Sequence, residues 1–382
     1  MLKDAGKYTN RHIWKISAPI TIGLLAQNII NVTDTAFLGR VGEVELGASA
    51  MGGLYYICLF TIFFGFSAGA QIITGRRNGE KNYAATGPVM IQGILFLLLL
   101  TVVLFGLSFF YADSIMRLMI SSDVIREATV TFLKWRIIGF FFDVFNVMFR
   151  AFYVGITKTR ILTLNAMVMA GTNVGLDYVL IFGKFGFPEM GLEGAAIASV
   201  ISEFASTLFF VIYTFLTVDR KKYGFVRFES IDFKLLKQVL GISIYTMFQY
   251  FISMGTFLLF FAAMERHGQH TLAIANIVRS IYIVMFIPLN ALSATSNTLV
   301  SNIIGEGKIG EVMSLVRRIS RLSFLIMSAC VLLLCLFPRA VLSVYTNDAT
   351  LVSGSVPSVY VISIALIISS IASVFFNSVS GT

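Results

Sequence analysis

The sequence predicts an all-α polytopic membrane protein, and three observations lead to that fold class. Hydrophobic residues make up 57% of the 382-residue chain and charged residues only 13%, whereas soluble proteins carry about 25% charged residues. The charges gather in short segments between apolar runs of about twenty residues or more, which is the length that spans a bilayer. The second half also repeats the first, so we expect two bundles related by a pseudo-two-fold axis along the membrane normal.

Apolar runs of spanning length predict ten transmembrane helices. Their expected ranges are 13–38, 46–73, 86–111, 127–149, 161–182, 194–217, 240–263, 272–301, 320–337 and 356–380. These helices divide into an N-terminal bundle of spans one to six (1–217), a cytoplasmic linker (218–239) and a C-terminal bundle of spans seven to ten (240–382).

Basic residues are concentrated in alternate connections between the spans. Lys and Arg cluster before the first span, between the second and third spans, and along the linker. Because basic loops stay on the cytoplasmic side, we expect a multi-pass protein of the cell (inner) membrane with a cytoplasmic N-terminus. That N-terminus leads into a full-length span without a small-residue cleavage site, so we expect no removable signal peptide.

The internal repeat has an offset of 226 residues (242 minus 16). Its matching positions include Ile16-Ser17 with Ile242-Ser243, Ser67-Ala68 with Ser293-Ala294, Gly79-Glu80 with Gly305-Glu306, and Gly155 with Gly381. Each complete copy would hold six spans, an even number, so both enter the membrane in the same orientation and the cleft between them is the expected pathway. Residues 156–217 have no counterpart after Thr382. We therefore expect a truncated chain whose second six-helix bundle lacks its last two helices.

Composition and spacing argue against other classes of protein. The net charge of +9 comes from Lys and Arg between spans, without a basic patch interleaved with aromatics, so we expect no nucleic-acid partner. Three cysteines lie inside apolar runs without a CxxC or Cys/His cluster, so neither a disulfide nor a zinc site is expected. All three histidines lie at span ends, and no side-chain constellation for an intramembrane enzyme is present.

Ionisable side chains inside a membrane span need a partner, water or a function. Asp34 and Asp177 lie near the ends of spans one and five, which both run outward, so they are expected in the same external half of the membrane. Ser199 and Glu203, near the start of span six, share that depth. Asn173 lies four residues before Asp177 and therefore on the same helix face.

The first span adds a polar stripe to these side chains. Gln27, Asn31 and Asp34 recur with helical period, and such a stripe should face the interior of the bundle because lipid offers it no hydrogen bonds. Carboxylate, amide and hydroxyl oxygens suit a hard cation such as Na⁺. They suit a proton equally, because two carboxylates close together in a low-dielectric pocket do not both ionise easily. The structural alternative is that Asp34 and Asp177 extend to the outer interface or pair with Arg40 and Lys184.

Other polar positions in the spans allow both structural and functional interpretations. Glu203 and Asp143 fit structural roles, Asp143 because it shares its helix with Lys134, Arg136 and Arg150, while Glu203 is also a candidate for the pathway. Arg279 in span eight suits helix pairing and pathway lining equally. Pro19 removes a backbone hydrogen bond in span one and is a candidate hinge, although transmembrane helices tolerate proline without such a role.

Four segments resemble signatures of the multidrug and toxic compound extrusion (MATE) family. The stretch from Val32 to Gly39 resembles the first-span signature of these transporters. Residues 173–177 and 191–199 resemble the signature of spans five and six, and residues 288–296 the pattern of span eight. This resemblance implies twelve spans in two six-helix bundles, alternating access, and export driven by Na⁺ or H⁺.

The family resemblance also implies roles for individual residues. Asp34, Asn173 and Asp177 match the first-bundle cation site by position, and Ser199 stands where a hydroxyl is often found. One branch of the family carries an acid in span seven, where this chain has Ser253, which favours the DinF-like branch. The position equivalent to Asp34 in the second repeat is Phe260, so the ion site is expected in the first half alone.

The predicted function is secondary active efflux of cationic or amphipathic small molecules by Na⁺ or H⁺ antiport. We expect a monomer in the lipid bilayer that needs no cofactor and no metal beyond the coupling ion. The alternative within the superfamily is a flippase for a lipid-linked oligosaccharide, which usually has several cationic residues lining its cavity. Arg279 is the one plausible candidate inside these spans.

Overall fold

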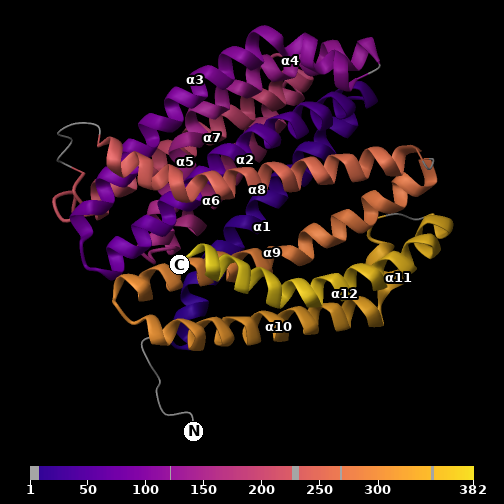
Figure 1. Ribbon diagram of the computed structural model, residues 1–382. Coiled ribbons are helices and arrows are strands. Elements are labelled where there is room, and N and C mark those ends of the chain that lie inside the picture. The colour runs from indigo at the N-terminus through magenta and orange to yellow at the C-terminus, as the bar shows by residue number, and fades with distance from the viewer. Residues whose placement is uncertain (1–7, 121, 226–231, 267–268, 346–347) are drawn as a thin grey trace. The chain divides into compact units, whose positions relative to one another are not determined.

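The computed structural model describes residues 8–120, 122–225, 232–266, 269–345 and 348–382, except for some side chains between 258 and 272. This part of the chain is helical and contains no strand (Figure 1). The helices are α1 (Asn10–Val41), α2 (Glu43–Gly79), α3 (Thr86–Met119), α4 (Asp123–Arg136), α5 (Phe140–Gly155), α6 (Arg160–Ile181), α7 (Gly191–Thr217), α8 (Phe233–Arg266), α9 (Gln269–Gly305), α10 (Val312–Leu336), α11 (Pro338–Leu342) and α12 (Ala349–Ser380).

The expected all-α polytopic fold is confirmed. Within the described residues, nine helical segments are long and apolar enough to cross a membrane, and they match every expected span except the seventh. The seventh corresponds to α8, a helix of 34 residues that includes positions outside the described side chains. The expected fourth span consists of α4 and α5, joined by a 3₁₀ turn at Ile137–Gly139. Residues 226–231 of the expected linker lie outside the described residues.

The chain forms two compact units whose borders follow the internal repeat. One unit contains Met1–Leu25 and Ile252–Thr382, and the other contains Ala26–Phe251. The two borders, after Leu25 and after Phe251, are one repeat offset apart (251 minus 25). The unit that contains most of the second repeat therefore also contains the beginning of α1. The unit that contains most of the first repeat also contains the beginning of α8. The division into bundles at residues 217 and 240 stays a prediction.

The turn that follows the second helix of each repeat has the same geometry in both units. The backbone N–H groups of Glu80, Lys81 and Asn82 donate to the carbonyls of Arg76, Asn78 and Arg77. At the same offset, those of Glu306, Gly307 and Lys308 donate to Asn302, Ile304 and Ile303. Lys81 and Gly307 both have left-handed backbones, with φ of 58° and 76°. A 3₁₀ turn follows each, at Tyr83–Ala85 and Ile309–Glu311.

Two further features extend the repeat without a gap across the third and fourth spans. Ser122 caps α4 by accepting the N–H of Ile125, and Asp348 caps α12 by accepting the N–H of Leu351 at the equivalent position. A side-chain carbon on Gly155 would press on the carbonyl of Gln71, and one on Gly381 would press on the carbonyl of Asn297. Glycine at both positions lets the fourth span of each repeat lie against the second.

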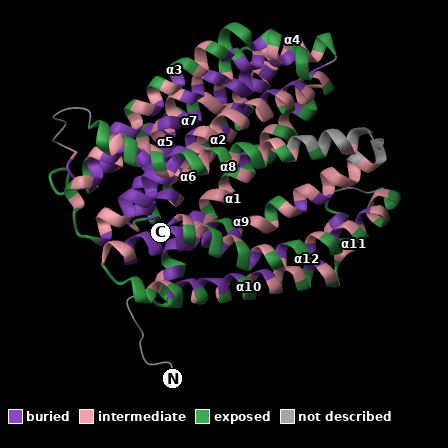
Figure 2. Ribbon diagram, viewed as in Figure 1, coloured by how far each residue is buried: buried purple, intermediate pink, exposed green. Residues whose placement is uncertain are grey.

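Aromatic packing holds α2 against α5 in the unit formed by Ala26–Phe251. The ring of Phe140 stacks on Tyr56 with a centroid distance of 4.4 Å and meets Phe63 edge to face at 5.4 Å. All three side chains are buried, and buried positions recur along α2, α5 and α7 (Figure 2). This apolar layer fixes the positions of the polar side chains that adjoin it.

Candidate functional site

A cavity of about 290 Å³ lies within the Ala26–Phe251 unit, among α1, α2, α4, α5, α6 and α7. Its polar lining comes from all six helices. These side chains are Gln27, Asn31, Asp34, Thr35, Ser49, Tyr56, Arg136, Asp143, Asn173, Ser199, Ser202 and Glu203. Ile30, Ile57 and Phe60 add an apolar surface. The lining includes three carboxyl groups and one guanidinium group, so the cavity is suited to positively charged species.

The first polar cluster combines Asp34 of α1 with Asn173 and Asp177 of α6. The Asp34 and Asp177 carboxyl groups lie within hydrogen-bonding reach of each other. Asn173 and Asp177 are completely buried, with 0% of each residue exposed to solvent. Neither atom of the Asn173 amide nor either oxygen of Asp177 has a hydrogen-bond donor or acceptor, and one oxygen of Asp34 is also unsatisfied.

Unsatisfied buried polar atoms are rare in folded proteins, and leaving a charged group unsatisfied costs several kcal/mol. Two ionised carboxylates are acceptors only, so they do not satisfy each other. A proton shared by Asp34 and Asp177, or a hard cation bound by their oxygens and the Asn173 amide oxygen, would supply what the cluster lacks. The cluster therefore has the chemistry of a cation or proton site.

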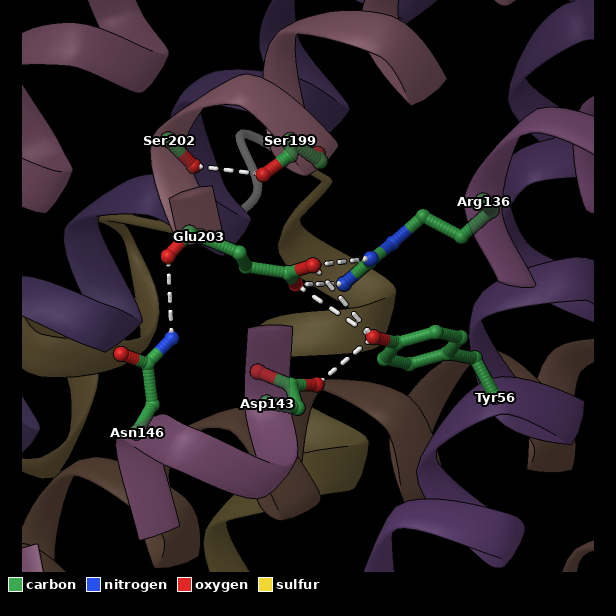
Figure 3. Close-up of polar contacts among 7 residues, drawn as sticks. All are labelled: Tyr56, Arg136, Asp143, Asn146, Ser199, Ser202 and Glu203. Atoms are coloured by element: carbon green, nitrogen blue, oxygen red, sulfur yellow. Dashed lines mark hydrogen bonds and ion pairs between the residues drawn. The ribbon is translucent and has the colours of Figure 1, made fainter. Parts of the chain in front are cut away.

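The second polar cluster lies deeper along α7 and is completely paired (Figure 3). Arg136 donates to both oxygens of Glu203, at 3.0 and 2.6 Å. Tyr56 Oη donates to Asp143 Oδ2 at 2.6 Å and lies 3.4 and 3.5 Å from the two Glu203 oxygens. The Arg136 guanidinium also covers the Tyr56 ring, 3.6 Å from its centroid. Two acids and one base thus share a single buried network, because the tyrosine hydroxyl joins Asp143 to the ion pair.

Gly139 makes this network possible. A side-chain carbon at this position would overlap Glu203 Oε2 and come within 2.5 Å of Arg136 Nη1 and 2.9 Å of Tyr56 Oη. Gly139 has ordinary helical backbone angles, so glycine is required here for close approach and not for its conformational freedom. It ends the 3₁₀ turn between α4 and α5, which places Arg136 and Asp143 on either side of it.

A chain of hydrogen bonds continues from Glu203 along α5, α6 and α7. Asn146 Nδ2 donates to the backbone carbonyl of Glu203 at 3.1 Å, and its Oδ1 accepts from Ser206 and Thr207. Asn165 of α6 donates to Ser206 at 2.8 Å. These neutral groups lock the three helices together on the side of the network away from the first cluster.

The structure gathers most of the residues singled out in the sequence. Gln27, Asn31, Asp34, Asn173, Ser199 and Glu203 all line the cavity, and Asp177 lies behind it against Asp34. Gln27 and Asn31 are solvent-exposed, so the polar stripe of α1 faces the open cavity. In the described part of the chain, Arg40 and Lys184 make no ion pair with Asp34 or Asp177.

Two singled-out residues lie in the other unit. Arg279 lines a separate cavity with Phe257, Tyr282 and Pro357, and its guanidinium is 5.9 Å from the centroid of the Phe257 ring. Pro19 lies inside the continuous helix α1, before the border at Leu25. Arg279 thus belongs to the unit that contains Ile252–Thr382, and its role in lining the pathway stays a prediction.

Sequence reasoning missed the role of Tyr56 and the partner of Arg136. An aromatic residue in an apolar span has no signal that separates a core ring from a hydrogen-bond donor. The shared helix of Arg136 and Asp143 favours a pair between them, but Arg136 binds Glu203, which is 67 residues away. The one available signal was a cation and an acid on the same span with a glycine between them.

Comparison with known proteins shows the class of molecule that this fold and site define. The MatE family model matches residues 19–179 and 243–382, one stretch in each half. The chain therefore belongs to the MatE family, whose members are membrane transporters and not enzymes. This confirms the family expected from the sequence and the expectation that the chain is not an enzyme.

Individual relatives are similar over different lengths. A probable multidrug resistance protein NorM of Idiomarina loihiensis is 27% identical over 56% of this chain, and the match covers 46% of that relative. A protein of the same description from Thermotoga maritima is 24% identical over 90% of the chain and 73% of its own length. The chain thus spans about half the length of the first of these curated relatives.

Solved structures share the fold at lower sequence identity. An outward-facing multidrug resistance MATE family transporter superposes on 99% of this chain with a TM-score of 0.88 and 19% identity, and the match covers 85% of that chain. A MOP superfamily transporter from Pyrococcus furiosus, whose description reports a binding pocket of reverse polarity, has a TM-score of 0.87 and 20% identity over 97% of this chain and 83% of its own.

Proposed function

We propose that the chain is a secondary active transporter that exports cationic or amphipathic small molecules by Na⁺ or H⁺ antiport with alternating access. The observation that supports this most directly is the unsatisfied cluster of Asp34, Asn173 and Asp177 at the edge of a cavity rich in carboxyl groups. Named relatives described as multidrug resistance proteins favour the same kind of substrate. We also propose that it acts as a monomer of the inner membrane with a cytoplasmic N-terminus, without a cofactor other than the coupling ion.

Competition for negative charge would couple the ion to the substrate. A cation or proton bound between Asp34 and Asp177 removes negative charge from the wall of the cavity, which weakens its attraction for a cationic substrate. Substrate bound beside Asp34 has the opposite effect on the ion, because coupling between two ligands is reciprocal. The same low-dielectric surroundings that leave the cluster unsatisfied make this electrostatic coupling strong.

Helix α1 is the element best placed to transmit this change. Asp34 contacts α6 through Asp177, and Pro19 interrupts the hydrogen bonding of α1 about four turns earlier. Binding of the ion would hold the outer part of α1 against α6, so that bending occurs at Pro19. Two solved structures of the same fold are described as the straight and bent conformations of MATE, which is consistent with such a hinge.

Flux measurements in proteoliposomes test the proposal. The full-length protein should release ²²Na⁺ or protons in the direction opposite to the transport of a fluorescent cationic substrate. Asp34→Asn should reduce the flux to that of protein-free liposomes, since an amide oxygen cannot replace the carboxylate charge. Thr35→Ser, on the next position of the cavity wall, is the matched control and should retain it. Substrate-driven flux that persists unchanged in Asp34→Asn would contradict the proposal.

The oligosaccharide flippase is less compatible with this cavity. Its substrates carry phosphate groups, and the cavity combines three carboxyl groups with one Arg136 guanidinium that is already bound to Glu203. Loss of glycan export without drug sensitivity in a deletion strain would favour the flippase instead.

A further inference from the structure

A second, basic cavity lies in the unit that contains Met1–Leu25 and Ile252–Thr382. It is formed by the first turn of α1 and the first half of α10, with a volume of about 910 Å³. Four arginines line it, namely Arg11, Arg317, Arg318 and Arg321. Met313 and Leu325 of α10 extend the lining with exposed apolar surface. A row of positive charge thus adjoins a row of apolar side chains on the same helix.

The described acidic residues do not neutralise the charges of this cavity. Within the described part of the chain, Arg11, Arg317 and Arg321 make no ion pair. Arg318 donates to the backbone carbonyl of Tyr8 at 2.8 Å, which ties the segment before α1 to α10. The N-terminal ends of α1 and α10 meet this cavity, and helix N-termini also favour anions.

Glu306, the acid in contact with Tyr8 beside this cavity, has other partners. Glu306 accepts a hydrogen bond from Tyr8 Oη at 3.0 Å and pairs with Lys308 at 3.3 Å. Burial and the charges of Glu306 and Glu311 hold the pKa of the Tyr8 hydroxyl well above its ordinary value, so Tyr8 stays a neutral donor to Glu306. Neither acid lines the cavity.

The first repeat shows that the fold does not require these arginines. The positions equivalent to Arg317, Arg318 and Arg321, 226 residues earlier, are Ile91, Gln92 and Leu95. Gln92, with its amide oriented to donate, bonds the backbone of Asp232 just before α8, much as Arg318 bonds the backbone just before α1. The same packing is therefore made with neutral side chains, and the additional charge in the second repeat needs another reason.

We propose that this basic cavity binds the headgroup of an anionic phospholipid from the cytoplasmic leaflet, with the acyl chains along Met313 and Leu325. The basic residues precede the apolar parts of α1 and α10, at the depth where headgroups lie, and the positive-inside topology places this end in the cytoplasmic leaflet. Cytoplasmic leaflets carry anionic lipid, and basic pockets between helices on that side are suited to it. Guanidinium groups bind phosphate through paired hydrogen bonds.

Fluorescence quenching of the 382-residue protein tests the proposal. Trp14 lies one turn after Arg11, and Trp135 is the other tryptophan of the chain, so the Trp135→Phe background leaves Trp14 as the reporter. Dibrominated phosphatidylglycerol should quench Trp14 at far lower mole fractions than dibrominated phosphatidylcholine. The double variant Arg317→Ile, Arg321→Leu carries the residues of the first repeat and should bind phosphatidylglycerol about 30-fold more weakly.

Two controls make the outcome decisive. The variant Arg317→Lys, Arg321→Lys keeps the charge and should retain most of the preference for phosphatidylglycerol. Free sn-glycerol 3-phosphate tests the headgroup alone and should not displace the brominated lipid. Equal quenching by both lipids, equal binding by the neutral variant, or displacement by glycerol phosphate would each overturn the assignment.

Discussion

The two repeats share backbone features, but their charged side chains differ. The first repeat has carboxyl groups at its cavity, and the second has arginines along α10. Turns, helix caps and close helix contacts recur at one offset, as Lys81 and Gly307 or Gly155 and Gly381 illustrate. Three charged residues of the cavity in the first repeat, and two residues that contact them, have uncharged counterparts in the second. The equivalent pairs are Asp34 and Phe260, Tyr56 and Tyr282, Arg136 and Ile362, Gly139 and Ala365, and Asp143 and Ser369.

This difference separates what the fold needs from what the function needs. Features present in both repeats, such as the glycines at the contact between the second and fourth spans, belong to the scaffold. Features present in one, such as the acids of the first repeat and Arg317 of the second, mark sites. Each repeat therefore supplies a natural control for substitutions in the other.

The largest expected effect is that of removing the cation of the buried network. Arg136→Met leaves Glu203 and Asp143 buried without their positive partner, and we expect it to lower the free energy of unfolding by about 3–5 kcal/mol. Ile362→Met makes the same residue at the equivalent position and should cost less than about 1.5 kcal/mol. Equilibrium unfolding in mixed micelles compares the two. Similar losses would mean that the network adds nothing to the shared scaffold.

A methyl group at Gly139 is expected to have the next largest effect. Gly139→Ala forces apart Glu203, Arg136 and Tyr56, and we expect a loss of about 3 kcal/mol because a buried ion pair has little room to move. The reciprocal change Ala365→Gly, on the exposed side of α12, should cost about 1 kcal/mol from helix propensity alone. Thermal unfolding followed by circular dichroism measures both, and a stabilising Gly139→Ala would refute the close approach.

Removing one hydroxyl tests how the network joins Asp143 to the ion pair. Tyr56→Phe deprives buried Asp143 of its donor and should cost about 2 kcal/mol. Tyr282→Phe should cost less than about 0.5 kcal/mol, because surface-type changes without a lost hydrogen bond are small and the described Tyr282 hydroxyl has none. Chemical unfolding of both variants distinguishes them, and equal stability would show that Tyr56 is only a packing ring.

The smallest expected effect concerns the shared turn. Gly307→Ala places a side chain in a left-handed conformation, φ of 76°, and should cost about 1 kcal/mol. Lys81→Gly relieves the same conformation in the other repeat but frees the unfolded chain, so the net change should be close to zero. Melting temperatures of the two variants test this, and a larger loss for Lys81→Gly would assign Lys81 a side-chain role.

The sequence was sufficient for nearly all of the spans and for several of the polar residues that line the cavity. Long apolar runs and the repeat offset predicted nearly every helix, and helical spacing placed Asp34, Asn173 and Ser199 on faces that meet. These predictions succeed because a membrane span must satisfy its backbone within one helix, so length and periodicity leave few alternatives. The repeat adds an internal check that an ordinary single-copy fold lacks.

The remaining features depend on contacts between distant segments. The break at Ile137–Gly139 lies against Glu203, a residue on another helix, and no local pattern in the fourth span predicts that contact. The sequence also does not show that the beginning of α1 packs with the second repeat and the beginning of α8 with the first. Both repeats have the same apolar pattern at their starts. Tyr56 was indistinguishable from the many aromatic residues that only pack.

The packing of the beginning of α1 with the second repeat has a consequence for biosynthesis. Tyr8 bonds Glu306, a partner 298 residues further along the chain, and at about 5–20 residues per second the ribosome needs about 15–60 s to make that stretch. The segment before α1 is therefore made well before the segment that contains its partner. Until Glu306 is made, the hydrogen bond that holds Tyr8 to the second repeat cannot form.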